Sequence, residues 1–129
     1  MISIKNEGII ISETELEFEN EDVLNPGIVQ EENTVHMFYR AVGRGNYSTI
    51  GYAQLEGPLT VVERNTEPLL IPTTSDEMHG IEDPRIVKID DVYYLTCCAY
   101  DGINASGSLA LSSDLIHFEK QGVINHRLI

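Results

Sequence analysis

The sequence predicts an all-β fold built from a repeated four-stranded unit, and two observations carry this prediction. From Val23 onward, short runs of β-branched and aromatic residues alternate with turn residues, a pattern typical of strands joined by tight turns. The pattern recurs at a constant offset, since Asn25 aligns with Asp83 and Ala41 with Ala99, 58 residues apart (83 − 25 and 99 − 41). A four-stranded unit that repeats every ~40–60 residues is typical of a propeller blade. A β-sandwich ranks second, because it does not require a second copy in register.

The predicted organisation has five segments: an N-terminal segment (1–22), a first blade (23–63), an inter-blade connection (64–82), a second blade (83–121), and the start of a next blade or a truncated end (122–129). In the first segment, the apolar run at residues 8–11 could be a strand, and the acidic residues 13–22 are expected to form a surface loop. Propellers need about four to eight blades to close. Two blades therefore predict the N-terminal part of a larger protein, or a fragment that assembles with copies of itself.

Each strand of the first blade follows from local residue preferences. A proline lacks an N–H and suits the first residue of a strand, so the first strand is expected to open at Pro26. The next three strands are rich in β-forming residues and are expected at residues 34–40, 49–53 and 59–63. The second blade repeats this order, with Pro84 opening its first strand.

Composition excludes several classes of function. Eight basic and 21 acidic residues give a net charge of −13, which argues against a nucleic-acid partner, because such a partner requires a basic surface. No apolar run reaches the ~18–20 residues that span a bilayer, so no membrane association is expected. The first residues lack the apolar core of a signal peptide, which favours a cytoplasmic location.

The cysteines and histidines predict no metal site and no cofactor. Cys97 and Cys98 are adjacent, so on a strand they point to opposite faces and are expected to be small buried hydrophobes. No Cys-x-x-Cys motif is present, and the four histidines have no metal-ligand spacing.

The candidate site centres on Asp83, within the run Gly-Ile-Glu-Asp-Pro-Arg-Ile at residues 80–86. A residue that precedes a proline favours extended geometry, which predicts that Asp83 lies at a rigid junction between loop and strand. Taken alone, the motif more often marks an edge-strand turn with a solvated acid. In a propeller, however, equivalent positions of successive blades face the same end of the channel, so Asn25 and Asp83 are expected to converge. An amide and a carboxylate at one pocket suit a polyhydroxylated ligand.

Further polar residues are candidates for the same pocket. Arg40 ends the second strand and is either a solvated charge or a residue that reaches the same rim. Glu82 either contacts the ligand or points away along the strand. Asp101 either lines the pocket or lies outside it.

These motifs resemble glycoside hydrolase family 130. The resemblance runs from residue 23 to residue 121 and rests on the run at residues 80–86, the Asn25-Pro26 blade start, the Phe38-Tyr39-Arg40 triplet and residues 114–118. It implies a five-bladed β-propeller, of which this chain supplies about the first two blades. It also implies activity on β-mannosides, as a phosphorylase or a β-1,2-mannosidase. The match to the five-bladed families 32 and 43 is looser.

The resemblance also implies roles for individual residues. Asp83 matches the family's catalytic aspartate, the single general acid of an inverting reaction, whose proton reaches the glycosidic oxygen through the O3 hydroxyl of the mannosyl unit. Asn25 and Arg40 match residues that bind that unit, and Arg85 is expected to position Asp83. A phosphorylase needs no general base, because phosphate is itself the nucleophile, but it needs cations to hold the phosphate.

The sequence therefore predicts inverting phosphorolysis of β-mannosides to α-mannose 1-phosphate, with inorganic phosphate as co-substrate and a β-mannose oligosaccharide as partner. The alternatives are an inverting hydrolase of the same family, a sugar-binding propeller without catalysis, or an inactive fragment. In the family, the residues that separate phosphorolysis from hydrolysis lie in later blades, beyond Ile129. The isolated 129-residue chain is therefore expected to be inactive, and its open blade edges could favour homo-oligomers.

Overall fold

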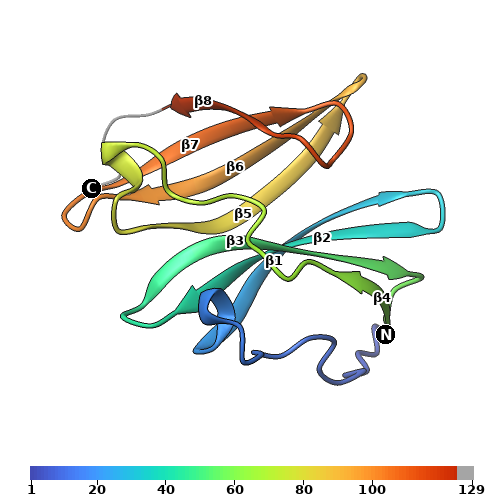
Figure 1. The fold of residues 1–129 in the computed structure, drawn as a ribbon. Coiled ribbons are helices and arrows are strands. Elements are labelled where there is room, and N and C mark those ends of the chain that lie inside the picture. Colours follow the sequence, from blue (N-terminus) through green and yellow to red (C-terminus); the bar gives the residue numbers. More distant parts are fainter. Residues whose placement is uncertain (125–129) are drawn as a thin grey trace.

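A computed structural model describes residues 1–124 and consists mainly of β-strands arranged in two four-stranded antiparallel units (Figure 1). The first unit contains β1 (Asp22–Glu31), β2 (Thr34–Gly43), β3 (Tyr47–Glu56) and β4 (Thr60–Arg64). The second contains β5 (Gly80–Ile89), β6 (Val92–Tyr100), β7 (Ala105–Ser112) and β8 (Glu119–Val123). Two short 3-10 helices, η1 (Glu17–Glu19) and η2 (Ser75–Glu77), precede the two units. Within the described part of the chain, no helix is long and apolar enough to cross a membrane.

The two units repeat each other in backbone detail. The first three strands of the second unit begin 58 residues after their counterparts (80 − 22, 92 − 34 and 105 − 47). A bulge interrupts the pairing of β1 with β2 between Leu24 and Gly27, and an equivalent bulge interrupts β5 between Glu82 and Arg85. The predicted 58-residue repeat is therefore confirmed for the register of the first two strands of each unit, whereas the pairing of β6 with β7 is displaced by one residue from that of β2 with β3.

The strand ends differ by a few residues from those expected. Strand β5 begins at Gly80 and runs through Pro84, so this proline lies within the strand rather than at its start. The bulge explains this, because the regular hydrogen-bond ladder is already interrupted where the proline lacks its N–H. Strand β8 continues pairing with β7 as far as Val123, so residues 122 and 123 belong to the second unit. Residues 125–129 lie outside the described part of the chain.

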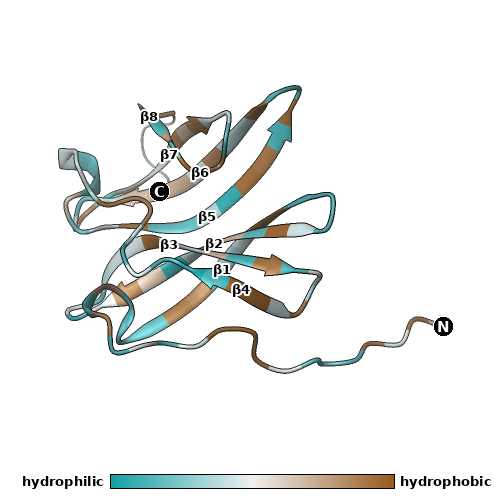
Figure 2. Cartoon of the chain, turned by 45° about the vertical axis from the view of Figure 1, so that its right-hand side comes forward, coloured by the Kyte–Doolittle hydropathy of each residue, from teal (hydrophilic) through white to brown (hydrophobic). Residues whose placement is uncertain are grey.

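Two apolar clusters lie on opposite faces of the first unit. One contains Phe38, Ile50, Ile81 and Leu95, so it joins β2 and β3 to the second unit. The other, on the far face, contains Val35, Met37, Tyr39, Ala41, Ala53 and Leu55. Hydrophobic and hydrophilic residues alternate along the strands accordingly (Figure 2), because successive side chains of a strand point to opposite faces. The first cluster holds the two units together and thereby brings β1 and β5 close to each other.

The N-terminal segment differs from what its sequence suggested. The strand expected at residues 8–11 does not form; this run instead borders a cavity beside Met37 and Tyr39, and Ile11 packs against the far-face cluster. The run contributes apolar side chains and makes no strand pairing.

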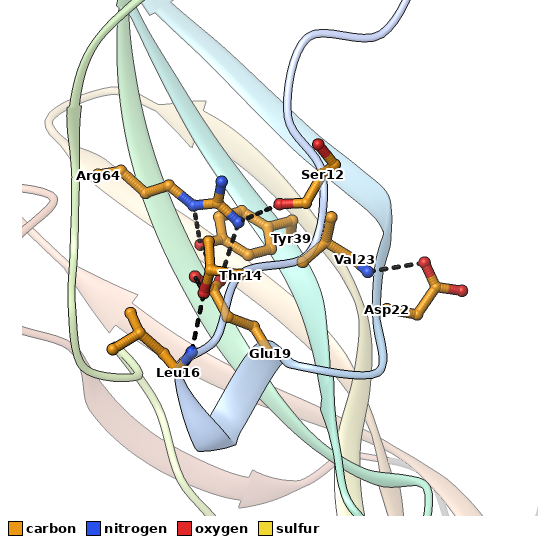
Figure 3. A network of polar contacts seen from close by, with 8 residues as sticks. All are labelled: Ser12, Thr14, Leu16, Glu19, Asp22, Val23, Tyr39 and Arg64. Carbon is orange, nitrogen blue, oxygen red and sulfur yellow. Dashed lines mark hydrogen bonds and ion pairs between the residues drawn. The ribbon is translucent and has the colours of Figure 1, made fainter.

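The acidic stretch at residues 13–22 is not wholly a surface loop, because Glu19 is fully buried. Its carboxylate accepts hydrogen bonds from the Tyr39 hydroxyl (2.7 Å) and the Thr14 hydroxyl (2.8 Å), and it forms an ion pair with Arg64 (3.1 Å) (Figure 3). Arg64 also donates to the Ser12 carbonyl. Burial, then the bond to Glu19, raises the pKa of Tyr39 to about 12, so its hydroxyl remains a donor. This network fastens the N-terminal segment to β2 and β4.

We expect Gly27→Ala to destabilise the protein, because β1 and β5 approach each other closely at this glycine. A Cβ at Gly27 would lie 2.8 Å from the Pro84 carbonyl oxygen, which is backbone and cannot rotate away. Overpacking of this kind costs about 1–3 kcal/mol. Urea unfolding measures the loss, with Gln30→Ala, at an exposed position of the same strand, as the control. Equal stability of the two variants would contradict this close approach.

Candidate active site

Asn25 and Asp83 meet where the two units face each other. The Asn25 Nδ2 donates to Asp83 Oδ1 at 2.7 Å. The two residues occupy equivalent bulges of β1 and β5, 58 residues apart. Their predicted convergence is therefore present in the structure.

The backbone at both residues differs from the expected extended geometry. Asn25 has φ = 50° and Asp83 has φ = 52°, both in the left-handed region. Asparagine and aspartate adopt this region more readily than other non-glycine residues. The bulges override the usual preference before a proline, because the strands on either side fix the direction of the chain. The residue types at these positions therefore suit the backbone as well as the chemistry.

Arg40 joins the same cluster from β2. Its Nη2 donates to Glu82 Oε1 at 2.9 Å, its Nε donates to Ser48 Oγ at 2.8 Å, and its Nη1 lies 3.9 Å from Asp83 Oδ1. The Arg40 side chain is only 16% exposed and that of Glu82 20%, whereas that of Asp83 is 43% exposed. Arg40 is therefore not a solvated charge. It forms, with Glu82, a mostly buried support for the more accessible Asp83 carboxylate.

The cluster keeps two groups available for a ligand. Within residues 1–124, no hydrogen bond is made to Asp83 Oδ2 or to Arg40 Nη1. A carboxylate oxygen accepts hydroxyl hydrogens, or donates one when protonated, and a guanidinium nitrogen donates. The combination can hold adjacent hydroxyls of a sugar and can transfer a proton at Asp83.

Two other candidates lie outside this cluster. The Arg85 Nη1 donates to the Pro84 carbonyl oxygen at 2.8 Å, and no contact joins it to the Asp83 carboxylate among the described residues. Asp101 closes the turn between β6 and β7, where its Oδ1 accepts the backbone N–H groups of Ile103 and Asn104. The hydrogen bond from Asn104 and then that from Ile103 lower the pKa of Asp101. The structure thus gives Asp101 a part in the turn and does not bring it to Asp83.

The sequence did not single out two neighbours of the site. Ser48 is fully buried beside Arg40, and no motif marks it; the pairing register of β2 with β3 would have placed it diagonally opposite Arg40. Cys98 pairs with Glu82 across β5 and β6. Burial, followed by the Glu82 and Asp83 carboxylates, raises the pKa of the Cys98 thiol, which favours its protonated form.

Cavity size does not locate this site. A cavity of about 680 Å³ opens beside the far-face cluster, lined in part by Phe18, Tyr47 and Thr49, and it includes no member of the Asp83 cluster. Among the described residues, no group of three or more His, Cys, Asp or Glu side chains could hold a metal ion. The chemistry of the converging side chains, rather than volume, identifies the site.

Comparison with known proteins agrees with the sequence motifs. The sequence profile of glycoside hydrolase family 130, described as β-1,4-mannooligosaccharide phosphorylase, matches residues 4–128. A 1,2-β-oligomannan phosphorylase of Thermoanaerobacter sp. (strain X514) is 31% identical over 96% of this chain and 46% of its own length. A β-1,2-mannobiose phosphorylase of the same organism is 35% identical over 77% of this chain and 37% of its own length. The chain thus spans less than half the length of these relatives.

A solved structure from the same family has a similar fold. It comes from work on GH130 glycoside hydrolases that target β-1,2 mannosidic linkages in Candida mannan, and it superimposes with a TM-score of 0.77 at 25% identity, over 88% of this chain and 38% of that one. The chain therefore belongs to glycoside hydrolase family 130, as an N-terminal portion that contributes two blades of its five-bladed β-propeller.

Proposed function

We propose that the protein carries out inverting phosphorolysis of β-mannosides, with Asp83 as its general acid. The proposal rests on the hydrogen bonding of the two oxygens of the Asp83 carboxylate. One of its oxygens is held by Asn25 at 2.7 Å, and the other makes no hydrogen bond within the described residues. The two curated relatives, both phosphorylases of β-1,2-linked mannosides, support this activity.

In the proposed reaction, Asn25 and Arg40 hold hydroxyls of the mannosyl unit. Asp83 releases a proton from Oδ2 through the O3 hydroxyl to the glycosidic oxygen, the bond from C1 to that oxygen breaks, and the acceptor sugar leaves. A phosphate oxygen attacks C1 from the opposite face and gives α-mannose 1-phosphate. The proton that Asp83 has lost is replaced by the one that HPO₄²⁻ loses, so the reaction balances without a separate base.

The supporting residues differ in what they can contribute. Arg40 is engaged by Glu82 and Ser48 and is mostly buried, so it suits an uncharged sugar hydroxyl better than a phosphate. We expect the cations that hold phosphate to lie outside residues 1–129, in agreement with the family resemblance. In this proposal residues 1–129 alone therefore have no turnover.

Hydrolysis is the second candidate, favoured by the solved structure from work on β-1,2-mannosidases of the same family. An inverting hydrolase needs a base ~6.5–9.5 Å from the acid, with a water molecule between them. Glu82 is next to Asp83, but its carboxylate is engaged by Arg40 at 2.9 Å, so it is not free to act as this base. In a hydrolase the base would therefore lie outside residues 1–129, as would the phosphate-binding cations of a phosphorylase.

The requirement for phosphate tests the proposal. The protein from the complete reading frame is incubated with a panel of β-mannosyl disaccharides, with and without inorganic phosphate, and sugar phosphate is quantified by ³¹P NMR. We expect cleavage only with phosphate, and none of α-mannosyl disaccharides. Cleavage at equal rates in both conditions would establish a hydrolase instead, and binding without cleavage would establish a sugar-binding protein.

A further inference from the structure

We infer that Ser48 is a positioning residue, which fixes the guanidinium of Arg40 so that its Nη1 faces Asp83 and the bound sugar. The inference rests on the proposed function, because it assigns Ser48 a part in the same sugar site. Ser48 itself does not touch the Asp83 carboxylate in any described contact; it acts through Arg40.

The geometry of Arg40 is the first argument. A guanidinium is planar, and its donors point in directions set by that plane. Ser48 Oγ accepts from Nε at 2.8 Å and Glu82 Oε1 accepts from Nη2 at 2.9 Å. These two hydrogen bonds leave from the same edge of the guanidinium, so they fix the orientation of its plane and its rotation within that plane. Nη1 is then left as the nitrogen that points toward Asp83, 3.9 Å from Oδ1.

The surroundings of Ser48 are the second argument. Ser48 is fully buried and lies at the seam between the units, where β3 pairs with β5 through Ser48 and Gly80. Gly80 has φ = 135°, and a Cβ there would lie 3.1 Å from the Ser48 backbone nitrogen. Close packing at this seam therefore restricts the movement of Ser48. A hydroxyl held in one place can fix the position of the Arg40 guanidinium that donates to it.

The repeat supplies the third argument. Cys98 lies 58 residues after Arg40 (98 − 40), and Ala105 pairs with Tyr100 as Ser48 pairs with Val42, so the second unit builds the corresponding hairpin with neither the arginine nor the serine hydroxyl. The Arg40–Ser48 pair is therefore not a requirement of the blade fold. Its presence at the site in the first unit points to a role in the site itself.

The test compares Ser48→Ala with Ser108→Ala in the full-length protein. Ser108 is a matched control, because its hydroxyl is also buried and donates to the Cys97 carbonyl oxygen at 3.2 Å, in the second unit. Both variants lose one buried hydrogen bond and should lose similar thermal stability. We expect kcat/KM for the mannoside to fall on the order of 10- to 100-fold for Ser48→Ala alone, because small displacements of a positioned group carry penalties of this size.

A double-mutant cycle with Arg40→Lys separates positioning from general packing. A lysine keeps the charge but has no plane for Ser48 to orient, so Ser48→Ala should have little further effect in that background. Ser48→Cys has a similar volume but offers only a weak acceptor. It replaces Ser48→Ala in the test if the alanine variant does not fold, and we expect the same fall in kcat/KM. Additive effects in the cycle, or wild-type kcat/KM in both Ser48 variants, would overturn the inference.

The inference can fail separately from the proposed function. If the wild-type protein shows no phosphorolysis, the same variants are compared by calorimetric affinity for the β-mannosyl disaccharide. Weaker binding by Ser48→Ala, with wild-type binding by Ser108→Ala, would support the positioning role despite failure of the proposed reaction. Equal affinities, or no binding by the wild-type protein, would overturn it.

Discussion

Replacing Asp83 with asparagine in the full-length protein is expected to lower kcat for phosphorolysis by about 10²–10⁴-fold, the usual contribution of a general acid. Asparagine has nearly the same shape, accepts the left-handed backbone at φ = 52°, and can still accept the hydrogen bond from Asn25. An NH2 group takes the place of Oδ2, and it cannot release a proton at neutral pH. Steady-state kinetics give the change in kcat, and calorimetry should show disaccharide affinity within a few-fold of wild type.

The matched control for this variant is Asp90→Asn. Asp90 is an exposed aspartate with φ = 53°, in the turn between β5 and β6, so it tests the same change of residue on the same backbone away from the cluster. It should retain wild-type turnover. Similar turnover in Asp83→Asn and Asp90→Asn would exclude Asp83 as the general acid.

The largest expected loss of stability comes from Arg64→Met. This change leaves the fully buried Glu19 carboxylate without its cation, although Tyr39 and Thr14 still donate to it. Breaking a buried ion pair on one side costs ~3–5 kcal/mol. Because the Arg64 side chain is 21% exposed and water can partly replace it, we expect a loss of about 3 kcal/mol in the free energy of unfolding, measured in urea.

Two further variants test the cause of this loss. Glu19→Gln combined with Arg64→Met removes the uncompensated charge and should recover part of the stability. Lys88→Met removes the partner of Glu31 in a more exposed ion pair and should cost much less. An Arg64→Met protein as stable as Lys88→Met would show that the Glu19 network does not fasten the N-terminal segment.

The central pair of the site could be predicted from the repeat. Equivalent positions of two blades face the same end of the structure, so the 58-residue offset was enough to place Asn25 near Asp83. Strand order also allowed Arg40 to reach the same rim, since β2 runs antiparallel to β1 and its end returns to the start of β1, but only the structure excludes a solvated charge there. These relations depend only on the order and direction of the strands. Both can be inferred from the alternation of strand-forming and turn-forming residues in the sequence.

Other features depend on interactions that local sequence does not record. The rule for a residue before proline predicted an extended Asp83, but the bulge in β5 imposed the left-handed conformation. An acidic segment suggested a surface loop, yet Glu19 is buried because Arg64, far along the chain, supplies its cation. Asp101 was one candidate for the pocket, but the backbone N–H groups of its own turn hold its carboxylate. In each case the deciding partner is set by tertiary structure or turn geometry.

The configuration of the first product tests inverting phosphorolysis most directly. The full-length protein is incubated with a β-mannosyl disaccharide and phosphate, and the anomeric proton is followed by NMR from the first minutes, before mutarotation or side reactions. Inverting phosphorolysis predicts α-mannose 1-phosphate as the initial product. Initial formation of β-mannose 1-phosphate, or of free mannose with no sugar phosphate, would contradict inverting phosphorolysis with Asp83 as the single acid.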